Sequence, residues 1–225
     1  MKFDIITIFP GIFDSYFSES ILKRAQKSNL IEIKAHDLRQ WTTDNHKSVD
    51  DSPYGGGAGM VMMVEPIFKA VQELKAQNPG SKERVILFSA KGKQFTQKDA
   101  RRLARYDRII MICGRYEGVD ERVARYIADE ELSVGNFVLT GGEIPAMILV
   151  DTVARLLPGV LGKEESLREE SFGEAGWVEY PQYTRPEDFN GWKVPEVLLS
   201  GDHKKIKQWR EQNAKGGNSQ LHKTD

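Results

Sequence analysis

Three short apolar runs in the middle of the chain, each followed by glycine, constrain the fold most. The runs are residues 109–113, 132–134 and 137–139, and the glycines that follow them are Gly114, Gly135 and the pair Gly141-Gly142. Each run predicts a strand, and the first is apolar throughout, as in strands buried on both faces of a sheet. Glycine at a strand end lets a ligand approach the backbone, and open α/β sheets bind ligands at the carboxyl ends of their strands. Three such ends close together therefore favour a ligand-binding site over three ordinary turns.

The composition indicates a soluble globular protein of one large or two small domains. The chain has 225 residues, of which 40% are apolar and 29% charged, and its formal net charge is −1. Because the chain is not a polycation, any contact with nucleic acid must come from local basic patches. The single cysteine, Cys113, excludes an internal disulfide framework, favours a core position over a nucleophile, and fits a reducing, cytoplasmic location. The longest apolar stretch, 144–161, is interrupted by prolines and charges, which predicts a core helix and no membrane span.

Predicted strands alternate with predicted helices, which favours a mainly parallel α/β sheet. Further strands are predicted at 3–9, 31–35 and 85–90, the last ending at residues 89–92. Apolar residues at helical spacing predict helices over 12–26, 60–75, 96–106 and 143–157, and Thr96 is the expected N-cap of the third. The polar, glycine-rich stretch 44–59 predicts a long loop, of a kind that is usually functional or mobile.

The character of the sequence changes after residue 157. Residues 1–160 are expected to form the α/β domain, and the charged segment 161–173, which lacks apolar periodicity, an interdomain linker. Residues 174–225 are expected to form a small, mostly helical second domain, with helices over 196–212 that break near Gly201.

Basic residues cluster in two segments of the chain. The first cluster comprises Lys82, Arg84, Lys91, Lys93, Lys98, Arg101, Arg102, Arg105 and Arg108, and the second Lys204, Lys205, Lys207, Arg210 and Lys215. A solvated helix face is the usual interpretation of such runs. With Trp209 and other aromatic residues nearby, phosphate binding is a reasonable hypothesis for them.

Several common cofactor and metal motifs are absent from the sequence. It has no G-x-x-x-x-G-K-[ST] loop, no G-x-G-x-x-G between a strand and a helix, and no His/Cys cluster with zinc spacing, so we expect no metal site. Asp151 and Arg155 lie four residues apart, on one face of the predicted helix. The two residues could form a structural ion pair, or Arg155 could be placed to stabilise a developing anion.

Five segments, in this order along nearly the whole chain, carry a specific resemblance. They are residues 50–60 (DDSPYGGGAGM), 114–122 (GRYEGVDER), 139–143 (LTGGE), 180–186 (YPQYTRP) and 194–201 (VPEVLLSG). The sequence resembles the bacterial tRNA (guanine-N1)-methyltransferases of the SPOUT superfamily. The resemblance implies a mainly parallel α/β sheet with a deep trefoil knot, a homodimer, and methylation of guanine N1 at position 37 of tRNA, next to the anticodon. It implies tRNA as the partner, held in part by the C-terminal domain, and neither DNA nor a membrane.

The resemblance also implies S-adenosylmethionine as the methyl donor, bound by loops of the knot. The donor-binding residues would be Phe88, Ser89, Gly92, Gly114, Tyr116, Gly118, Ser133, Val134, Gly135, Asn136, Phe137, Val138, Leu139, Gly141 and Gly142. The tRNA-binding residues would be Tyr54, Gly55, Ala58, Gly59, Arg115, Glu117, Asp151 and Arg185. The family usually has Asp-Tyr where this chain has Asn136-Phe137, so backbone contacts to the donor should survive while side-chain contacts differ.

The chemistry of the implied reaction needs a base and a cation. Guanine N1 carries a proton at neutral pH, and the negative charge that develops on O6 when this proton leaves must be stabilised. Arg155 matches the family's arginine proposed for O6, and Glu170 stands where the family has an aspartate as the base. The longer glutamate shifts the carboxylate by about one C–C bond length, which is enough to change a rate. Glu169 is the alternative base, and a solvated acidic linker is the alternative interpretation of both.

Other functions and one cofactor stay open from the sequence. The chain could be a SPOUT enzyme with another RNA target, or a catalytically impaired RNA-binding homologue, which Glu170, Asn136 and Phe137 would explain. Whether Mg²⁺ assists the reaction is also left open.

Overall fold

A computed structural model describes residues 1–161, 171–172 and 178–214 of the chain. The chain divides into two compact units, Met1–Gly162 and Lys163–Asp225. Most of the predicted linker, 161–173, lies outside the described residues. In the described part of the chain, no helix has the length and apolar character that crossing a membrane requires.

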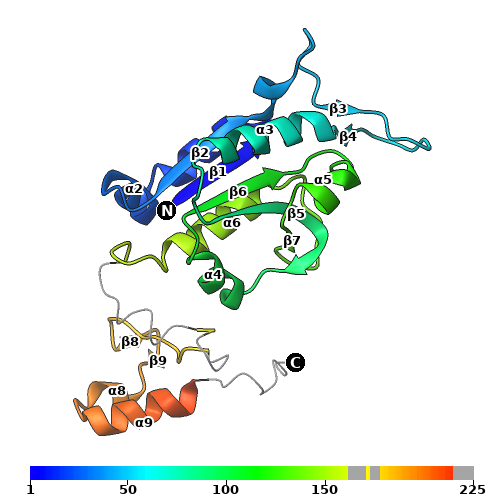
Figure 1. The fold of residues 1–225 in the computed structure, drawn as a ribbon. Helices are drawn as coiled ribbons and strands as arrows, with labels where there is room; N and C mark the ends of the chain where they lie inside the picture. The colour runs from blue at the N-terminus through cyan, green and yellow to red at the C-terminus, as the bar shows by residue number, and fades with distance from the viewer. Residues whose placement is uncertain (162–170, 173–177, 215–225) are drawn as a thin grey trace. The chain divides into compact units, whose positions relative to one another are not determined.

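The first unit is built on a parallel sheet, as the alternation of strands and helices predicts (Figure 1). Its strands are β1 (Lys2–Thr7), β2 (Glu32–Asp37), β5 (Glu83–Gln94), β6 (Arg108–Cys113) and β7 (Glu130–Ser133). They lie in the order β2-β1-β6-β5-β7, and every neighbouring pair is parallel. The central strand β6 is buried along its whole length, which confirms the interpretation of its continuous apolar run.

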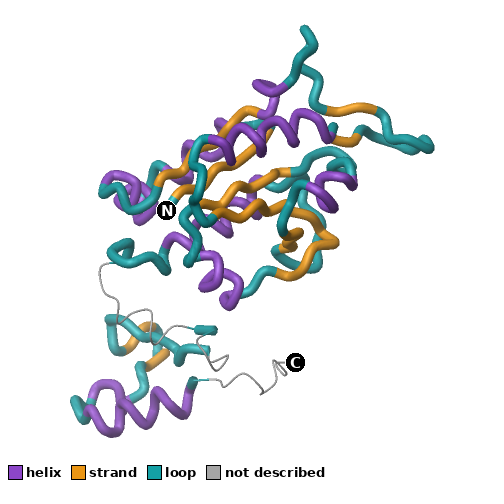
Figure 2. The backbone as a smooth tube through the Cα atoms, viewed as in Figure 1, coloured by secondary structure: helices purple, strands orange, loops and turns teal. Residues whose placement is uncertain are grey.

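Helices cover both faces of this sheet (Figure 2). One core contains residues of α3 (Val64–Ala76) and α5 (Glu121–Tyr126), and the other those of α2 (Ser20–Lys27), α4 (Gln97–Leu103) and α6 (Glu143–Ala154). Alternation along β6 sends Ile110 and Ile112 into the first core and Ile109 and Met111 into the second. The cap predicted for α4 is confirmed, since Thr96 and Asp99 form a capping box.

Two predicted helices begin or continue differently from the expectation. The helix predicted over 12–26 is divided into a 3₁₀ turn η1 (Pro10–Phe13), the short α1 (Asp14–Phe17) and α2. The chain turns at the start of α2, where the first residue, Ser20, has a φ of 50°, which interrupts a continuous α-helix. The helix predicted from residue 60 starts at Val64, because β4 (Val61–Met62) pairs with β3 (Asp50–Asp51) in a small antiparallel ribbon. The loop between these two strands projects beyond the sheet (Figure 1).

Two predictions about strands were wrong, the strand at 137–139 and the end of the strand that begins near residue 85. Residues 137–139 form no strand, and the side chains of Phe137 and Val138 are exposed. Strand β5 does not end at 89–92 but continues to Gln94, with a shift of register in which Leu132 of β7 faces first Phe88 and then Lys93. An apolar run alone cannot distinguish a strand from a loop that lines a cavity.

The described residues of the second unit form a hairpin and two helices. Strands β8 (Asp188–Phe189) and β9 (Trp192–Lys193) pair antiparallel, and α8 (Glu196–Leu199) precedes α9 (His203–Asn213). The predicted break near Gly201 is confirmed, since the Asp202 side chain caps α9 by accepting from two backbone N–H groups.

In the first unit, another 3₁₀ turn, η2 (Leu38–Trp41), follows β2.

Candidate functional site

A cavity of about 480 Å³ lies beside the register shift within β5 and the carboxyl ends of β6 and β7. Its walls come from four stretches of chain, which are residues 87–91, 114–119, 131–135 and 137–142. The predicted donor-binding residues all line this cavity except Gly92 and Asn136. Two of the predicted tRNA-binding residues, Arg115 and Glu117, line it as well. The loops that contain the three predicted strand ends therefore do meet at one site, although one of the three runs is not a strand.

The cavity also has lining residues that the sequence analysis did not single out for the site. They are Leu87, Ala90, Lys91, Val119, Glu121, Ala124, Glu131, Leu132, Thr140 and Pro145. Of these, Ala90, Lys91 and Thr140 lie at or directly after predicted strand ends, whereas Glu131 precedes the run 132–134 and gave no such signal in the sequence.

Two glycines let backbone segments from distant parts of the chain touch. The Gly142 N–H donates to the Gly114 carbonyl over 3.0 Å, and a Cβ at Gly142 would lie 2.7 Å from the Cα atom of Cys113. A Cβ at Gly92 would lie 2.7 Å from backbone atoms of Glu131 and Leu132. Since real Cβ atoms do not approach backbone this closely, both positions require glycine. Gly92 thus serves the packing of β7 on β5, which explains why it does not line the cavity.

The loop after β7 is shaped by its own side chains. The Ser133 hydroxyl donates to the Gly135 carbonyl over 3.0 Å, and the Phe137 ring lies where a Cβ of Gly135 would be. The side chain of Asn136 is exposed and lies outside the cavity wall. The loop therefore presents its backbone, and the ring of Phe137, to the cavity.

Some buried polar atoms at this site have no hydrogen-bond partner among the described residues. Four buried side-chain atoms of the described residues have no hydrogen-bond partner, and they are Glu83 Oε2, Arg115 Nε, Glu131 Oε1 and Glu143 Oε2. Arg115 and Glu131 line the cavity, and Arg115 Nε and Glu143 Oε2 lie 2.9 Å apart as an ion pair without the alignment of a hydrogen bond. Because a buried polar atom normally has a partner, the free oxygen of Glu131 indicates a place for a hydrogen-bond donor of a ligand.

Other groups at the cavity have structural or surface roles. Lys91 Nζ and Glu121 Oε2 form an exposed ion pair of 2.6 Å, and this contact raises the pKa of the Lys91 ammonium. Cys113 is fully buried, and burial raises the pKa of its thiol well above the usual value. The core interpretation of Cys113 is therefore confirmed.

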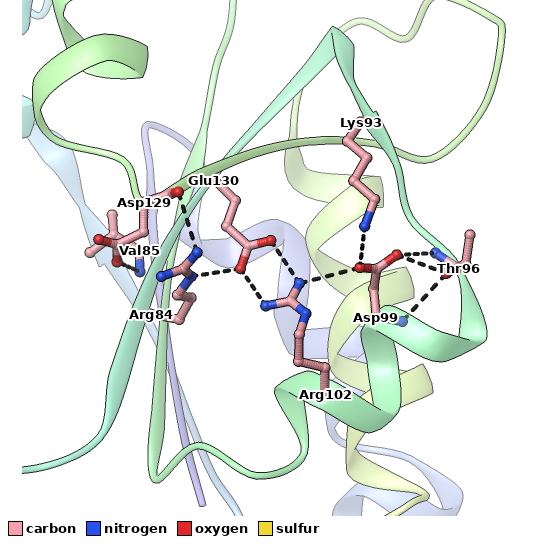
Figure 3. Close-up of polar contacts among 8 residues, drawn as sticks. All are labelled: Arg84, Val85, Lys93, Thr96, Asp99, Arg102, Asp129 and Glu130. Carbon is pink, nitrogen blue, oxygen red and sulfur yellow. Dashed lines mark hydrogen bonds and ion pairs between the residues drawn. The ribbon is translucent and has the colours of Figure 1, made fainter.

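A network of ion pairs holds β7 in place beside the cavity (Figure 3). Glu130 accepts from Arg84 Nε over 2.6 Å and from both terminal nitrogens of Arg102 over 2.7 Å. Asp99 accepts from Arg102 over 3.3 Å and from Lys93 over 2.6 Å. Burial would raise the pKa of the Glu130 carboxyl, but the hydrogen bonds from the two arginines lower it on balance.

Much of the first basic cluster is thus engaged within the protein. Arg84, Lys93 and Arg102 belong to the network, Lys91 pairs with Glu121, and Arg108 is buried against Asp4. Because these cations already neutralise carboxylates of the chain, phosphate binding is supported mainly by the members of the second cluster on α9, which are Lys204, Lys205, Lys207 and Arg210. Lys215 lies outside the described residues.

The remaining predicted tRNA-binding residues lie outside the cavity wall. Gly59 packs against the Glu117 side chain, and the Met62 N–H donates to the Gly118 carbonyl, which connects the glycine-rich loop to a cavity loop. Tyr54, Gly55 and Ala58 are exposed in that loop, and Arg185 is exposed in the second unit.

The predicted pair lies at the C-terminal end of α6, where the Arg155 N–H donates to the Asp151 carbonyl over 3.2 Å. Asp151 accepts from the Tyr16 hydroxyl over 2.7 Å, a contact that raises the pKa of Tyr16 to about 12. Arg155 is the C-cap residue of α6, just beyond the last helical residue. Both candidate bases, Glu169 and Glu170, lie outside the described residues. Within the described ranges, no group of three or more His, Cys, Asp or Glu residues could hold a metal ion.

Comparisons with known proteins agree on one family. The family model of the tRNA (guanine-1)-methyltransferase TrmD matches residues 1–225. A tRNA (guanine-N(1)-)-methyltransferase of Citrifermentans bemidjiense is 56% identical over 210 residues, which cover 93% of this chain and 83% of that protein. One of Dictyoglomus turgidum is 56% identical over 214 residues, covering 95% of this chain and 85% of the relative.

A solved structure shows the same likeness. The crystal structure of the tRNA (m1G37) methyltransferase from Aquifex aeolicus matches with a TM-score of 0.78 and 42% sequence identity. The match covers 93% of this chain and 87% of that one.

Proposed function

The chain belongs to the TrmD family of tRNA (guanine-1)-methyltransferases, and we propose that it methylates N1 of guanine 37 in tRNA with S-adenosylmethionine as the donor. The observation that carries the proposal is the cavity beside β5 and the carboxyl ends of β6 and β7, because it assembles the segments that the family resemblance assigns to the donor. The sulfonium of the donor would supply an activated methyl group, because the neutral thioether that remains is a good leaving group.

The residues at the cavity fit such a donor. The volume of about 480 Å³ lies in the range of small-molecule sites, and the walls combine apolar side chains with exposed backbone. Glu131 offers a buried, unpartnered carboxylate oxygen to an amino or hydroxyl group of the donor. Backbone groups of the loop 133–139 would make the remaining polar contacts, so the replacement of the family's Asp-Tyr by Asn136-Phe137 is compatible with binding.

The chain's own side chains would move the proton and stabilise the charge. We assign removal of the guanine N1 proton to Glu170, with Glu169 as the alternative, and the stabilisation of the charge on O6 to Arg155. Arg155 directly follows α6, where the negative end of the helix dipole favours a cation. Asp151, which lies at the same end of α6 and accepts a hydrogen bond from Tyr16, is assigned to tRNA binding.

An exposed apolar face supports a homodimer. Phe9, Ile12, Tyr16, Ile144 and Ile148 are each between 39% and 50% exposed, and they lie on η1, α1 and α6 or directly before η1. The hydrogen bond between Tyr16 and Asp151 shows that α1 and α6 are neighbours, so these side chains belong to one surface. A contiguous apolar surface on an otherwise polar protein is typical of an interface, and a second copy of the chain is its proposed occupant.

The second unit is proposed to hold the tRNA. The rings of Phe189 and Trp192 at the β8–β9 hairpin are 56% and 73% exposed, and α9 presents Lys204, Lys205 and Lys207. Exposed rings can stack on bases, and lysines attract the phosphates.

We further propose that the close backbone crossings at Gly92 and Gly142 belong to the trefoil knot implied by the family resemblance. The protein is also proposed to work in the cytoplasm.

The test is a paired methylation assay. Purified full-length protein with S-adenosylmethionine should methylate a tRNA that carries G37 and leave the same tRNA with A37 unmodified, with 1-methylguanosine as the product identified by mass spectrometry. Parallel reactions with MgCl₂ and with EDTA measure the contribution of a divalent ion. Equal methylation of both tRNAs, or a modified nucleoside at another position, would refute the assignment of the target. Donor binding without any turnover would identify a catalytically impaired homologue.

A further inference from the structure

Arg115 lines the cavity, and two of the three residues that hold its side chain, Glu143 and Phe9, lie outside the cavity wall. Arg115 follows Gly114 at the end of β6, and its side chain is 19% exposed. Its Nε lies 2.9 Å from Glu143 Oε2, its Nη1 donates to the Thr140 carbonyl over 3.3 Å, and its guanidinium lies 4.8 Å from the centre of the Phe9 ring. Charge, hydrogen bonding and a cation–π contact therefore fix one side of this group.

Behind Arg115, the Glu143 carboxylate is 1% exposed and is itself oriented by Thr7. The Thr7 hydroxyl donates to Glu143 Oε1 over 2.8 Å and accepts from the Phe9 N–H over 3.0 Å. Because a hydroxyl has one proton, this proton points to Glu143. Glu143 is also the first residue of α6, where the helix dipole stabilises a negative charge.

The backbone leaves room for this arrangement. A Cβ at Gly141 would lie 2.3 Å from Arg115 Nε and 2.5 Å from Glu143 Oε2. The Arg115–Glu143 pair thus occupies the space above Gly141, and a side chain there would displace it. Three segments of the chain, at the ends of β1 and β6 and at the start of α6, converge on one guanidinium.

One nitrogen of that guanidinium stays available. Within the ranges that the structure describes, no group accepts a hydrogen bond from Arg115 Nη2, although Nε and Nη1 are engaged. A buried carboxylate that has a single cationic partner fixes that partner strongly, since separating the pair would leave a charge uncompensated. The free N–H groups of an arginine held in this way can bind an oxygen without further loss of side-chain entropy.

We propose that Glu143 and Thr7 are positioning residues, which hold Arg115 so that its Nη2 group binds an oxygen of the tRNA close to the target guanine. This inference rests on the proposed function, and it adds two residues that would act on the substrate only through Arg115. Arg115 sits at the rim and is partly exposed, which favours an oxygen of the incoming RNA over the carboxylate of the methyl donor.

The test is a double-mutant cycle measured by kcat/KM for tRNA at saturating S-adenosylmethionine. Glu143→Gln should lower kcat/KM by about 10- to 100-fold, and Thr7→Val, which replaces the hydroxyl with a methyl group, by about 5- to 10-fold. Thr7→Ser, which keeps the hydroxyl, should retain most of the wild-type kcat/KM. In the Arg115→Ala background both changes should have less than about a twofold effect, because residues that act through one group are not additive. Glu65→Gln, which breaks an exposed ion pair with Lys69, is the matched control.

Three results would overturn the inference. Losses that multiply in the Arg115→Ala background would show independent, structural roles. A weaker affinity for S-adenosylmethionine in Thr7→Val, measured by calorimetry, would place Arg115 on the donor. A melting temperature of Thr7→Val far below that of Thr7→Ser, with equal activity of the folded fractions, would reduce the hydroxyl to a stability role. If the wild type binds tRNA but methylates none, the proposed function fails, while the same cycle can still be measured on tRNA affinity.

Discussion

Glu131 shows how a single buried atom can indicate a ligand. The carboxylate of Glu130, one residue earlier, is fully engaged by two arginines, whereas Glu131 Oε1 is buried and has no partner among the described residues. Alternation along β7 explains the contrast, since successive side chains point to opposite faces of the strand. One face is turned toward the ion-pair network and the other toward the cavity.

The first prediction tests Glu131 as a donor-binding residue. Glu131→Gln keeps the shape of the side chain but removes its charge, and a hydrogen bond to a charged group is stronger than one to a neutral group. We expect the dissociation constant of S-adenosylmethionine, measured by isothermal titration calorimetry, to rise by about 5- to 10-fold. Glu83→Gln is the matched control, because Glu83 also has an unpartnered buried oxygen but lies at the opposite end of β5. Equal affinities in the wild type and Glu131→Gln would contradict the assignment.

At the scale of elements, the cavity depends on the attachment of β7. This four-residue strand lies at the edge of the sheet and pairs only with β5, across a shift of register. The arginines of β5 and α4 that hold Glu130 compensate for this short pairing (Figure 3). The ion pairs therefore stabilise the strand from which the loop 133–139 departs.

The second prediction concerns the pH dependence of this attachment. The folded-state pKa of Glu130 lies below its usual value of 4.5, so its pairing contributes stability that is fully present above that pH and is lost as the pH falls through the folded-state pKa. Glu130→Gln should lower the free energy of unfolding at pH 7 by about 2 kcal/mol, because two arginines lose a largely buried charged partner.

Urea denaturation at pH 7 and at pH 3.5 measures the effect. The difference between wild type and Glu130→Gln should shrink at the lower pH, because pH 3.5 lies below the usual pKa of 4.5 and the carboxylate is then largely protonated in the unfolded chain. Glu32→Gln, which removes an exposed partner of Lys2, should change the stability little at either pH. A difference that is the same at both pH values would exclude the charge of Glu130 as its cause.

The same elements show what the sequence could and could not predict. The runs that became β1, β5 and β6 are long and apolar, and their alternation with helices was enough to predict the sheet. The partners of the basic cluster were not predictable, because Glu130 and Asp4 are distant in sequence from Arg102 and Arg108. Residues 137–139 look like a strand because both a strand and a cavity wall select apolar side chains.

Residues of the site were predictable to different degrees. The glycines that follow strands marked the cavity loops, since their role is local and depends on the backbone. Glu143 and Thr7 gave no signal as site residues, because the contact that joins them spans 136 positions of the chain. The proposed base, Glu170, rests on the family resemblance alone and remains a prediction.

At the scale of the whole molecule, the apolar face of η1, α1 and α6 has the composition of an interface. Its side chains come from segments that also carry the site, since Phe9 lies under Arg115 and Ile144 follows Glu143. If a second copy of the chain covers this face, assembly and the position of Arg115 are linked. A change on this face should then affect both the oligomeric state and the activity.

The last prediction separates this face from other exposed apolar positions. Ile148→Asp places a charge in the centre of α6, where Ile148 is 39% exposed, and burial of an unpaired charge would cost several kcal/mol. We expect the wild type to sediment as a dimer and Ile148→Asp to sediment largely as a monomer, with its tRNA methylation reduced by at least about tenfold. Phe68→Asp is the matched control, because Phe68 is 48% exposed on α3, which packs on the opposite face of the sheet. It should leave both the sedimentation and the activity close to those of the wild type. A wild-type chain that sediments as an active monomer would show that this face is not a homodimer interface, and that the site is complete within one chain.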